Sequence, residues 1–438
     1  MTYTDAITFL ESLIDYERTP ADVAAHRVWN LDRIRHMLEA VGNPHVGLRC
    51  LHIAGTRGKG STAVITASIL TSAGYRVGLY TSPHLVCFRE RIRIGTSLIS
   101  EADVSSLVEE VRPVIESMRG SELGPPSFFE VYTLLALIHF ARENVDFAVL
   151  EPGMGGRLDA TNIVNPMACA ITRIGLDHTQ ELGETLAQIA GEKAGIIKSG
   201  VPVVTIRQLD EAHRVIEQVC TEKGCALLVV GNEPGPSVSA VEMVDDRQVL
   251  SISQPDSTSL DVECPLLGMH QVENVALAVG LVELLSQQGI VVPITAIREG
   301  IRSVRWPGRF EVIRRNPYVV LDGAHDATGA DALVAAVNAV LPGRRVILVF
   351  GMMRGHDAEA VASRLCSIAD RVIVASCASS RAVDALELSQ VSTRYSRSCT
   401  IRTPVAQALE EAISLAGGDD VVLVAGSLYV VGEAMMAL

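Results

Sequence analysis

The stretch HIAGTRGKGST, residues 52–62, follows a short apolar run and precedes a segment of helical character. Backbone N–H groups of such a glycine-rich loop, with the N-terminus of the next helix behind them, form a cradle for an anion. The spacing departs from the standard phosphate-loop pattern, because Ile53 stands at the first glycine position and Gly60 separates Lys59 from the hydroxyls. Three glycines, a lysine and two hydroxyl side chains still favour a phosphate loop over a plain strand-to-helix turn. Lys59 would contact the terminal phosphates, and the Ser61 hydroxyl would bind Mg²⁺.

Apolar runs of strand length alternate with longer helical segments on both sides of this loop. The alternation predicts a mostly parallel sheet covered by helices, whose ligands gather at the carboxyl ends of the strands. The stretch 231–260 is rich in Pro, Ser and Asp and predicts a small antiparallel appendage, followed by a helix at 271–289. In the first half of the chain the apolar runs lie at 51–54, 76–80, 146–150, 168–172 and 202–206.

A second alternation of apolar runs and helical segments begins after residue 300. Its runs lie at 318–321, 345–350, 371–375 and 420–425. The sequence therefore predicts an α/β protein with a phosphate-loop-type, mostly parallel sheet domain that carries the antiparallel appendage, followed by a smaller Rossmann-like α/β domain. We place the boundary near residues 300–308, around Trp306 and Pro307, which gives domains 1–303 and 304–438. A length of 438 residues suits two or three domains.

The composition is that of a globular protein, with 48% hydrophobic and 20% charged residues. A net charge of −14 argues against a nucleic-acid-binding surface, which needs clustered Lys and Arg. Residues 1–20 lack a secretory pattern and predict a short amphipathic helix, and the most apolar segment, 131–140, is too short to span a membrane. Nine cysteines without CxxC pairing indicate buried hydrophobes in a reducing cytosol. We expect neither a nucleic-acid nor a membrane partner.

A second glycine-rich loop, EPGMGGRLDATN (151–162), follows one of the predicted strands. An acidic residue at the end of an apolar strand is the usual second anchor for a phosphate-bound Mg²⁺, which makes Glu151 a candidate metal ligand. Arg157 and Asp159 in the same loop fit ligand contacts and structural ion pairs equally well.

A third loop, RIGLDHTQELGET (173–185), follows the next strand. A lone histidine is more often structural, but the position of His178 at the same sheet edge makes it a candidate metal ligand. The helix after it carries Glu192, Lys193 and Lys198, a pattern typical of a solvated charged face.

The segment DGAHDATG (322–329) follows the first strand of the second domain and precedes a helix. Asp322 and His325 thus lie at another strand end, where they could serve a site between the domains. N-capping and turn formation by Asp322 or Asp326 explain the pattern equally well.

Together these loops resemble the folylpolyglutamate synthase and dihydrofolate synthase family, within the Mur ligase superfamily. The matching segments occur in the family's order over nearly the whole chain. They are HIAGTRGKGST, TSPHLVCFRERIRIG (81–95), SFFEVYTLLA (127–136), LEPGMGGRLDATNIV (150–164), ITRIGLDHTQELGETLAQIAGEKAGIIK (171–198), GMHQVENVALA (268–278), WPGRFE (306–311), LDGAHD (321–326), GMMRGHD (351–357) and GSLYVVGEA (426–434).

The resemblance implies ATP and Mg²⁺ as cofactors and assigns roles position by position. Ser61, Glu151 and His178 match the family's magnesium ligands. Lys193 matches a lysine that is carbamylated in this superfamily, a change that would turn a cation into an anionic oxygen ligand. The positions that match nucleotide-binding residues are Gly55, Thr56, Gly58, Lys59, Gly60, Ser61, Thr62, Asn274, Arg309 and Asp322.

The resemblance also implies binding sites for the two other substrates. Ser82, His84 and Arg91 lie in the segment associated with the pterin-bearing substrate, and His325 and Ser427 match positions near the incoming glutamate. The groups expected to act in catalysis are Lys59, Lys193, Asp322 and His325.

Two positions depart from the family pattern. Arg57 replaces the Asn usual in the phosphate loop, where it adds either a phosphate contact or only a surface charge. Asp326 replaces the usual Asn after His325 and changes the local hydrogen-bond pattern. Neither change removes a group that the chemistry requires.

The implied reaction is ATP-dependent amide formation with L-glutamate on a folate or dihydropteroate carboxylate. The carboxylate attacks the γ-phosphate of ATP to give an acyl phosphate and ADP, and the glutamate amino group then displaces phosphate. Closure of the two domains about the linker at 300–308 would keep water from the acyl phosphate. The expected partners are these small molecules, and we expect a monomer.

Two other functions fit parts of the sequence. A cell-wall Mur ligase uses the same chemistry on a nucleotide-linked peptide, but such enzymes usually carry a separate domain before the phosphate loop, and the 54 residues before Gly55 are too few for it. A regulatory module that binds ATP without ligation would show no glutamate-stimulated ADP release. The sequence does not distinguish whether dihydropteroate, a folate or both provide the carboxylate that receives glutamate.

Overall fold

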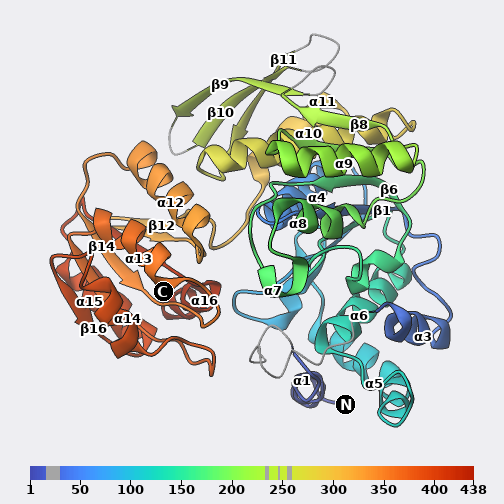
Figure 1. Ribbon diagram of the computed structural model, residues 1–438, viewed down its shortest axis with the longest axis horizontal. Helices are drawn as coiled ribbons and strands as arrows, with labels where there is room; N and C mark the ends of the chain where they lie inside the picture. Colours follow the sequence, from blue (N-terminus) through green and yellow to red (C-terminus); the bar gives the residue numbers. More distant parts are fainter. Residues whose placement is uncertain (16–29, 232–235, 245–246, 254–258) are drawn as a thin grey trace.

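Continuous apolar runs form the strands of the larger sheet, as expected where helices cover both faces of a parallel sheet. The computed structural model describes residues 1–15, 30–231, 236–244, 247–253 and 259–438. The strand order of this sheet is β4-β3-β2-β5-β1-β6-β7-β8, parallel throughout except for β3 and β4 (Figure 1). Its strands are β1 Cys50–Ala54, β2 Val77–Tyr80, β3 Ile92–Ile94, β4 Ser97–Leu98, β5 Phe147–Leu150, β6 Pro166–Ile171, β7 Val203–Ile206 and β8 Leu227–Val230.

Helices cover both faces of this sheet. α4 Lys59–Ser72, α10 Met269–Ser286 and α11 Ile294–Ser303 share a core with one face. The opposite face packs against two other groups of helices. The first group is α1 Tyr3–Glu11, α3 Asp32–Ala40, α5 Glu101–Met118 and α6 Phe128–Arg142. The second group is α8 Leu186–Ala194 and α9 Asp210–Glu222. Three short helical turns lie in the loops of this half: η1 Phe88–Arg91, η2 Ala160–Ile163 and α7 Thr179–Leu182.

The contact between α4 and α11 is made backbone to backbone. A Cβ on Gly300 of α11 would lie 2.4 Å from the Cα of Ile69 in α4, so only glycine fits there. The Ser68 hydroxyl of α4 donates a hydrogen bond to the carbonyl of Gly300 at 2.7 Å. The two helices are therefore locked together, and the chain leaves α11 directly into the linker between the domains.

The appendage is a three-stranded antiparallel sheet of β9 Ser237–Val244, β10 Arg247–Ser253 and β11 Ser259–Cys264, in the order β11-β10-β9. Buried and less buried residues alternate along β10 and β11, as they do when one face of a sheet is packed. The buried face, with Leu250 and Val262, belongs to the core around α10 and α11.

A six-stranded sheet forms the core of the second half, in the order β12-β13-β17-β14-β15-β16 (Figure 1). Only β12 runs antiparallel to its neighbour. The strands are β12 Glu311–Arg315, β13 Tyr318–Leu321, β14 Val346–Phe350, β15 Arg371–Val374, β16 Cys399–Ile401 and β17 Val421–Ala425. One face packs on α12 Ala327–Val340, α13 Ala358–Leu365, the turn η3 Cys366–Ile368 and α14 Ala385–Ser392, and the other on α15 Val405–Leu415 and α16 Leu428–Ala437.

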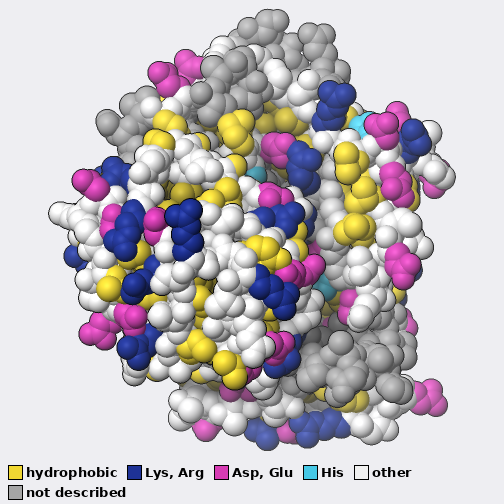
Figure 2. Space-filling model, turned by 60° about the vertical axis from the view of Figure 1, so that its left-hand side comes forward, with side chains coloured by type: hydrophobic (Ala, Val, Ile, Leu, Met, Phe, Trp, Pro, Cys, Tyr) yellow, Lys and Arg dark blue, Asp and Glu magenta, His cyan; other side chains and the backbone are white. Residues whose placement is uncertain are grey.

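The predicted fold class is confirmed, and each of the apolar runs named above forms a strand. Five strands that the sequence did not indicate, β3, β4, β8, β12 and β16, are short and lie at or next to a sheet edge. The predicted N-terminal helix ends at Glu11, and residues 16–20 of that prediction lie outside the described residues, as do parts of the appendage. Within the described residues, no helix combines the length and apolar character needed to cross a membrane. On the face shown in Figure 2, basic and acidic side chains are interspersed.

His52, in the middle of β1, is fully buried, with Nε2 2.8 Å from the Thr161 hydroxyl. Burial, reinforced by the charge of Lys198, lowers the pKa of His52 to about 3. Below about pH 6.5 His52 is therefore protonated in the unfolded chain but stays neutral in the folded chain. The free energy of unfolding falls as the pH drops below that value. Above pH 6.5 both states are neutral and the effect vanishes.

We expect His52→Gln, which does not titrate, to lose less free energy of unfolding than the wild type between pH 7 and pH 5. The difference can approach ~1.4 kcal/mol per pH unit below pH 6.5. Urea unfolding at both pH values measures it. Equal losses in the two proteins would contradict the assignment of His52 as a neutral buried base.

Candidate active site

The order of strands around β1 determines which loops meet. β1 pairs in parallel with β5 on one side and β6 on the other, with His52 opposite Leu150 and Ala54 opposite Ile171. The phosphate loop after β1, Glu151 after β5 and the third loop after β6 therefore emerge at one edge of the sheet. This is the edge where ligands bind in α/β proteins.

The glycines of the phosphate loop are required by close neighbours. Gly58 has φ +87°, and a Cβ on it would lie 2.2 Å from the Asn274 Oδ1 of α10. A Cβ on Gly60 would lie 2.9 Å from the Trp306 ring, in the linker between the domains. The loop thus touches both α10 and the linker, and no larger residue fits at either position.

The backbone of the phosphate loop is fixed against the third loop, and its role as an anion cradle stays a prediction. The N–H groups of Thr56 and Arg57 donate to the carbonyl of Arg173, which fixes the loop backbone. Helix α4 begins at Lys59, whose ammonium lies 3.4 Å from the carbonyl of Thr56. Ser61 is buried in the first turn of α4, where the first N–H groups of a helix lack intrahelical partners.

Glu151 faces this cradle from the end of β5. Its carboxylate accepts a hydrogen bond from the N–H of Ser82 at 3.3 Å, and a Cβ on Gly60 would lie 3.2 Å from its Oε2. Burial raises the pKa of Glu151 to about 7, against the opposing charges of Lys59 and Arg309. A buried carboxylate beside the candidate phosphate loop is an oxygen ligand of the kind that suits a hard cation such as Mg²⁺, whose charge would add to those of Lys59 and Arg309 in favouring the ionised form.

His178 occupies a bend at the start of α7. Its φ is +48°, an unusual value for a residue other than glycine, and its side chain is half-exposed. Its Nε2 lies 3.8 Å from Asp177, and burial lowers its pKa. Within the described residues no three His, Cys, Asp or Glu side chains converge on a metal position. A magnesium site here would therefore combine Ser61, Glu151 and His178 with phosphate and water oxygens.

Lys193 lies on α8 and is only 3% exposed. Burial, followed by the positive charge of Lys59, lowers its pKa to about 7, while Asp177 and Asp159 oppose the shift. The solvated charged face considered for this helix is therefore wrong for Lys193. A buried lysine that is partly neutral at physiological pH is a nucleophile rather than a surface cation.

Asp322 and Arg309 connect the second domain to the linker. The carboxylate of Asp322 accepts hydrogen bonds from the N–H groups of Phe310 and Ala324, at 2.7 and 2.8 Å, so the turn-forming role considered for it is present. Burial lowers the pKa of Arg309, whereas the charges of Asp322 and Glu151 raise it. Arg309 is therefore a partly buried cation that interacts electrostatically with Asp322 and with Glu151 of the larger sheet.

His325 lies in the loop after β13, with Nδ1 2.8 Å from the carbonyl of Gly323. Its ring packs edge-on against His356 at a centroid distance of 4.8 Å. Burial lowers the pKa of His356 to about 4, and the charges of His325, Asp177 and His178 also act on it. His356 therefore lies between the domains, although the sequence placed it only within a matching segment.

Ser427 and Asp326 cap helices of the second domain. The Ser427 hydroxyl accepts a hydrogen bond from the N–H of Tyr429 at the start of α16. Asp326 caps α12 by accepting from the N–H of Gly329 at 2.8 Å, as the capping alternative required. Both side chains follow strands of the small sheet, at the end that faces the linker.

The three residues predicted to bind the pterin-bearing substrate, Ser82, His84 and Arg91, lie in two different places. Ser82, before a cis-proline, reaches Glu151 through its N–H group. Arg91 is buried, donates to His84 Nδ1 at 3.0 Å and lies over the Phe128 ring, 5.2 Å from its centroid. Ser82 thus lies at the candidate metal site, while Arg91 and His84 form a packed unit beneath the surface.

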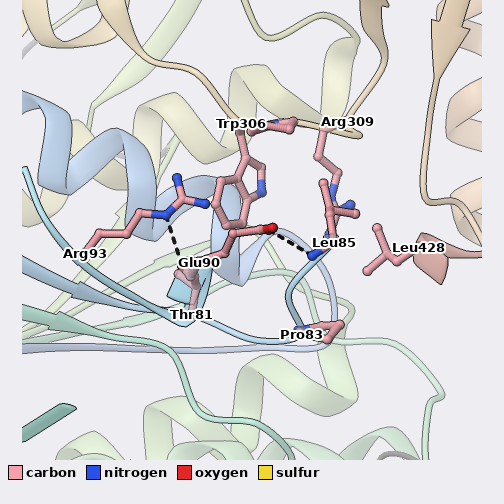
Figure 3. A pocket seen from close by; sticks show the side chains of 9 residues that line it. Thr81, Pro83, Leu85, Glu90, Arg93, Trp306, Arg309 and Leu428 are labelled. Carbon is pink, nitrogen blue, oxygen red and sulfur yellow. Dashed lines mark hydrogen bonds between the residues drawn. The ribbon is translucent and has the colours of Figure 1, made fainter. Parts of the chain in front are cut away.

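A small pocket lies where the linker meets both domains (Figure 3). The guanidinium of Arg93 lies over the Trp306 ring, 5.3 Å from its centroid, and Glu90 accepts a hydrogen bond from the N–H of Leu85 at 2.9 Å. The lining residues are Thr81, Pro83, Leu85, Glu90, Arg93, Trp306, Pro307, Arg309 and Leu428. The sequence indicated Trp306 only as part of the linker.

Arg157 and Asp159 show the structural alternatives that the sequence left open. Arg157 pairs with Glu192 of α8 at 2.8 Å. Asp159 is buried and accepts hydrogen bonds from the N–H and hydroxyl of Thr161. These contacts fix the second glycine-rich loop against α8.

The sequence matches two family profiles. They are the Mur ligase middle domain over residues 53–282 and the Mur ligase, glutamate ligase domain, over residues 308–428. A probable bifunctional folylpolyglutamate synthase/dihydropteroate synthase of Halobacterium salinarum is 38% identical over 99% of this chain and 51% of its own. The chain thus spans about half the length of this relative and of a similarly named one from Haloferax volcanii.

Other relatives match over most of both chains. A dihydrofolate synthase/folylpolyglutamate synthase of Bacillus subtilis is 34% identical over 92% of this chain and 93% of its own. A solved structure of a Mycobacterium tuberculosis folylpolyglutamate synthase complexed with ADP and AMPPCP covers 99% of this chain and 98% of its own, with a TM-score of 0.89 at 30% identity. The chain therefore belongs to the folylpolyglutamate synthase and dihydrofolate synthase family of Mur ligases.

Proposed function

We propose that this protein is an ATP-dependent ligase that joins L-glutamate to the carboxylate of a folate or of dihydropteroate. The observation that carries the proposal is the buried carboxylate of Glu151, which lies next to the phosphate loop and interacts electrostatically with Lys59 of that loop and with Arg309 of the linker. Such a set of groups suits transfer of a phosphoryl group between two bound anions. The M. tuberculosis relative, solved with ADP and AMPPCP, supports an adenine nucleotide as the ligand of this loop.

In the first step the acceptor carboxylate attacks the γ-phosphorus, an acyl–phosphate bond forms and ADP leaves. Two unit charges about 4 Å apart repel by roughly 4 kcal/mol at an effective dielectric constant of about 20. Lys59, Arg309 and the N–H groups of the loop offset this repulsion where the phosphoryl group moves. Mg²⁺, when bound by Ser61, Glu151 and His178, would add positive charge at the same place.

In the second step the glutamate amine attacks the acyl carbon, a C–N bond forms and phosphate leaves. The glutamate ammonium group must first release a proton to solvent, before closure, to give the amine that attacks. His325 and Ser427 of the second domain would bind the incoming glutamate. The linker at 300–308 would act as the hinge between the proposed domains 1–303 and 304–438. Closure there would keep water from the acyl phosphate.

Lys193 is proposed to be carbamylated. Carbon dioxide adds to a neutral amine to give a carbamate anion and a proton, so a pKa of about 7 favours the modification at neutral pH. The product would place an anionic oxygen ligand near His178, because Lys193 is close enough for its charge to lower the pKa of His178.

The names of the relatives support two acceptors. The two archaeal relatives carry a dihydropteroate synthase in their names, and the B. subtilis relative is named for both glutamate-adding activities. We therefore propose that dihydropteroate and reduced folates are both accepted. The nine cysteines, all free, support a reducing compartment, the cytoplasm, and a monomer stays a prediction.

Dihydropteroate and tetrahydrofolate, each offered with ATP and isotopically labelled glutamate, should both gain one glutamate by mass. ADP release should depend on glutamate. ATP hydrolysis that neither acceptor nor glutamate stimulates would contradict the ligase and favour a nucleotide-binding regulatory module.

Lys59→Ala and Glu151→Gln should each lower glutamate-dependent ADP release by at least ~100-fold, because each removes charge from the phosphoryl-transfer site. Lys223→Ala and Glu143→Gln are the matched controls. Lys223, at the C-terminus of α9, donates a hydrogen bond to the carbonyl of Ile197, and Glu143 forms an ion pair with Arg76 on the surface. Near-normal turnover in either site variant, with the controls active, would refute its assignment.

Protein equilibrated with ¹³C-bicarbonate should give a carbamate NMR signal that is absent from Lys193→Ala. The signal should strengthen from pH 6 to pH 8, because the neutral amine that reacts becomes more abundant above its pKa of about 7. Small carboxylates should partly restore activity to Lys193→Ala. A wild-type spectrum identical to that of the variant would disprove the modification.

A further inference from the structure

The two residues that depart from the family pattern contact each other across the two domains. Arg57, in the phosphate loop, donates from Nε to both carboxylate oxygens of Asp326 at 3.1 Å and from Nη2 to Oδ1 at 2.7 Å. The residues are 269 positions apart in the chain. Their side chains are 24% and 28% exposed, so this two-pronged ion pair is partly shielded from water.

Both ends of the ion pair are held rigidly. The Arg57 carbonyl accepts a hydrogen bond from the Thr172 hydroxyl at 2.7 Å, and a Cβ on Gly175 would lie 2.6 Å from its Nη1. Asp326 uses the same Oδ1 to cap α12 through Gly329. Because neither backbone can drift, the ion pair fixes the phosphate loop relative to the N-terminus of α12.

The pKa of Asp326 shows that the pairing is favourable. Burial alone would raise this pKa, but the hydrogen bonds and charge of Arg57 bring it below its usual value. The Nε–Nη2 edge of the guanidinium is therefore committed to Asp326 in this arrangement.

We propose that Arg57 and Asp326 are positioning residues that clamp the phosphate loop to the second domain and so set where His325 stands relative to the γ-phosphate. The residue before Asp326 in the chain is His325, so a shift of the clamp moves that histidine directly. This inference rests on the proposed ligase function, because the distance it controls is that between the acyl phosphate and the incoming amine.

The test uses Arg57→Asn, Asp326→Asn and the double variant. Asparagine caps helices as well as aspartate does, so Asp326→Asn removes the charge and keeps α12 intact. Each single variant should lower kcat/KM for glutamate about tenfold, and the double variant should lose no more than the worse single, because the two side chains act as one unit. In Asp326→Asn the KM for ATP should stay within about twofold, since Asp326 does not touch the loop backbone.

Small-angle X-ray scattering of the nucleotide-free protein gives a second readout that does not need activity. The wild type should expand when salt screens the partly exposed ion pair, and Asp326→Asn should show the expanded curve at low salt. The control is Asp331→Asn on the same helix, which loses its ion pair with Arg364 inside the small domain and should match the wild type in scattering and kinetics.

The outcomes separate the two hypotheses. If wild-type protein shows no glutamate-dependent ADP release, the ligase proposal fails, while the scattering curves still report on the clamp. Single-variant effects that multiply in the double variant, or an Asp326→Asn protein with wild-type scattering, would overturn the clamp and leave the ligase intact.

Discussion

The parallel pairing of β1 with β5 and β6 is the constraint on which the candidate site depends. Each of these strands ends in a loop that carries one part of the site, and hydrogen-bonded register leaves those loops no freedom to separate. Glu151 reaches Gly60 because their strands are neighbours, although they are far apart in the chain. The smaller domain adds its own strand-end residues, and the linker brings Arg309 to the same place.

The site holds more buried charge than a purely structural core would retain. Glu151, Lys193 and Arg309 are all desolvated, and burial moves the pKa of each toward its neutral form. Charges of this kind are costly unless partners compensate them, and here they compensate one another in part, as Glu151 does with Lys59 and Arg309. Under the proposed function, ATP and Mg²⁺ would supply further compensating charges, so binding would relieve an electrostatic cost already present in the fold.

Much of the fold could be predicted because its strands are buried on both faces and therefore read as continuous apolar runs. The edge strands β12 and β16 could not be predicted from apolar runs, since they are exposed along much of their length and carry polar residues. Loop residues after strands, such as Glu151, could be identified from position and chemistry. The Arg57–Asp326 contact could not, because nothing local in the sequence signals a partner so distant, and a single histidine such as His356 carries little information until a second lies beside it.

The backbone contact of Gly300 with Ile69 connects the phosphate loop rigidly to the linker. Helix α4 starts at the phosphate loop, and α11 ends at the linker, so the two helices connect these two segments. Where main chains touch without side chains between them, there is no soft layer to absorb a displacement. Close-packed main chains have little room to slide past each other, so a displacement of α4 is expected to carry α11, and with it the start of the linker.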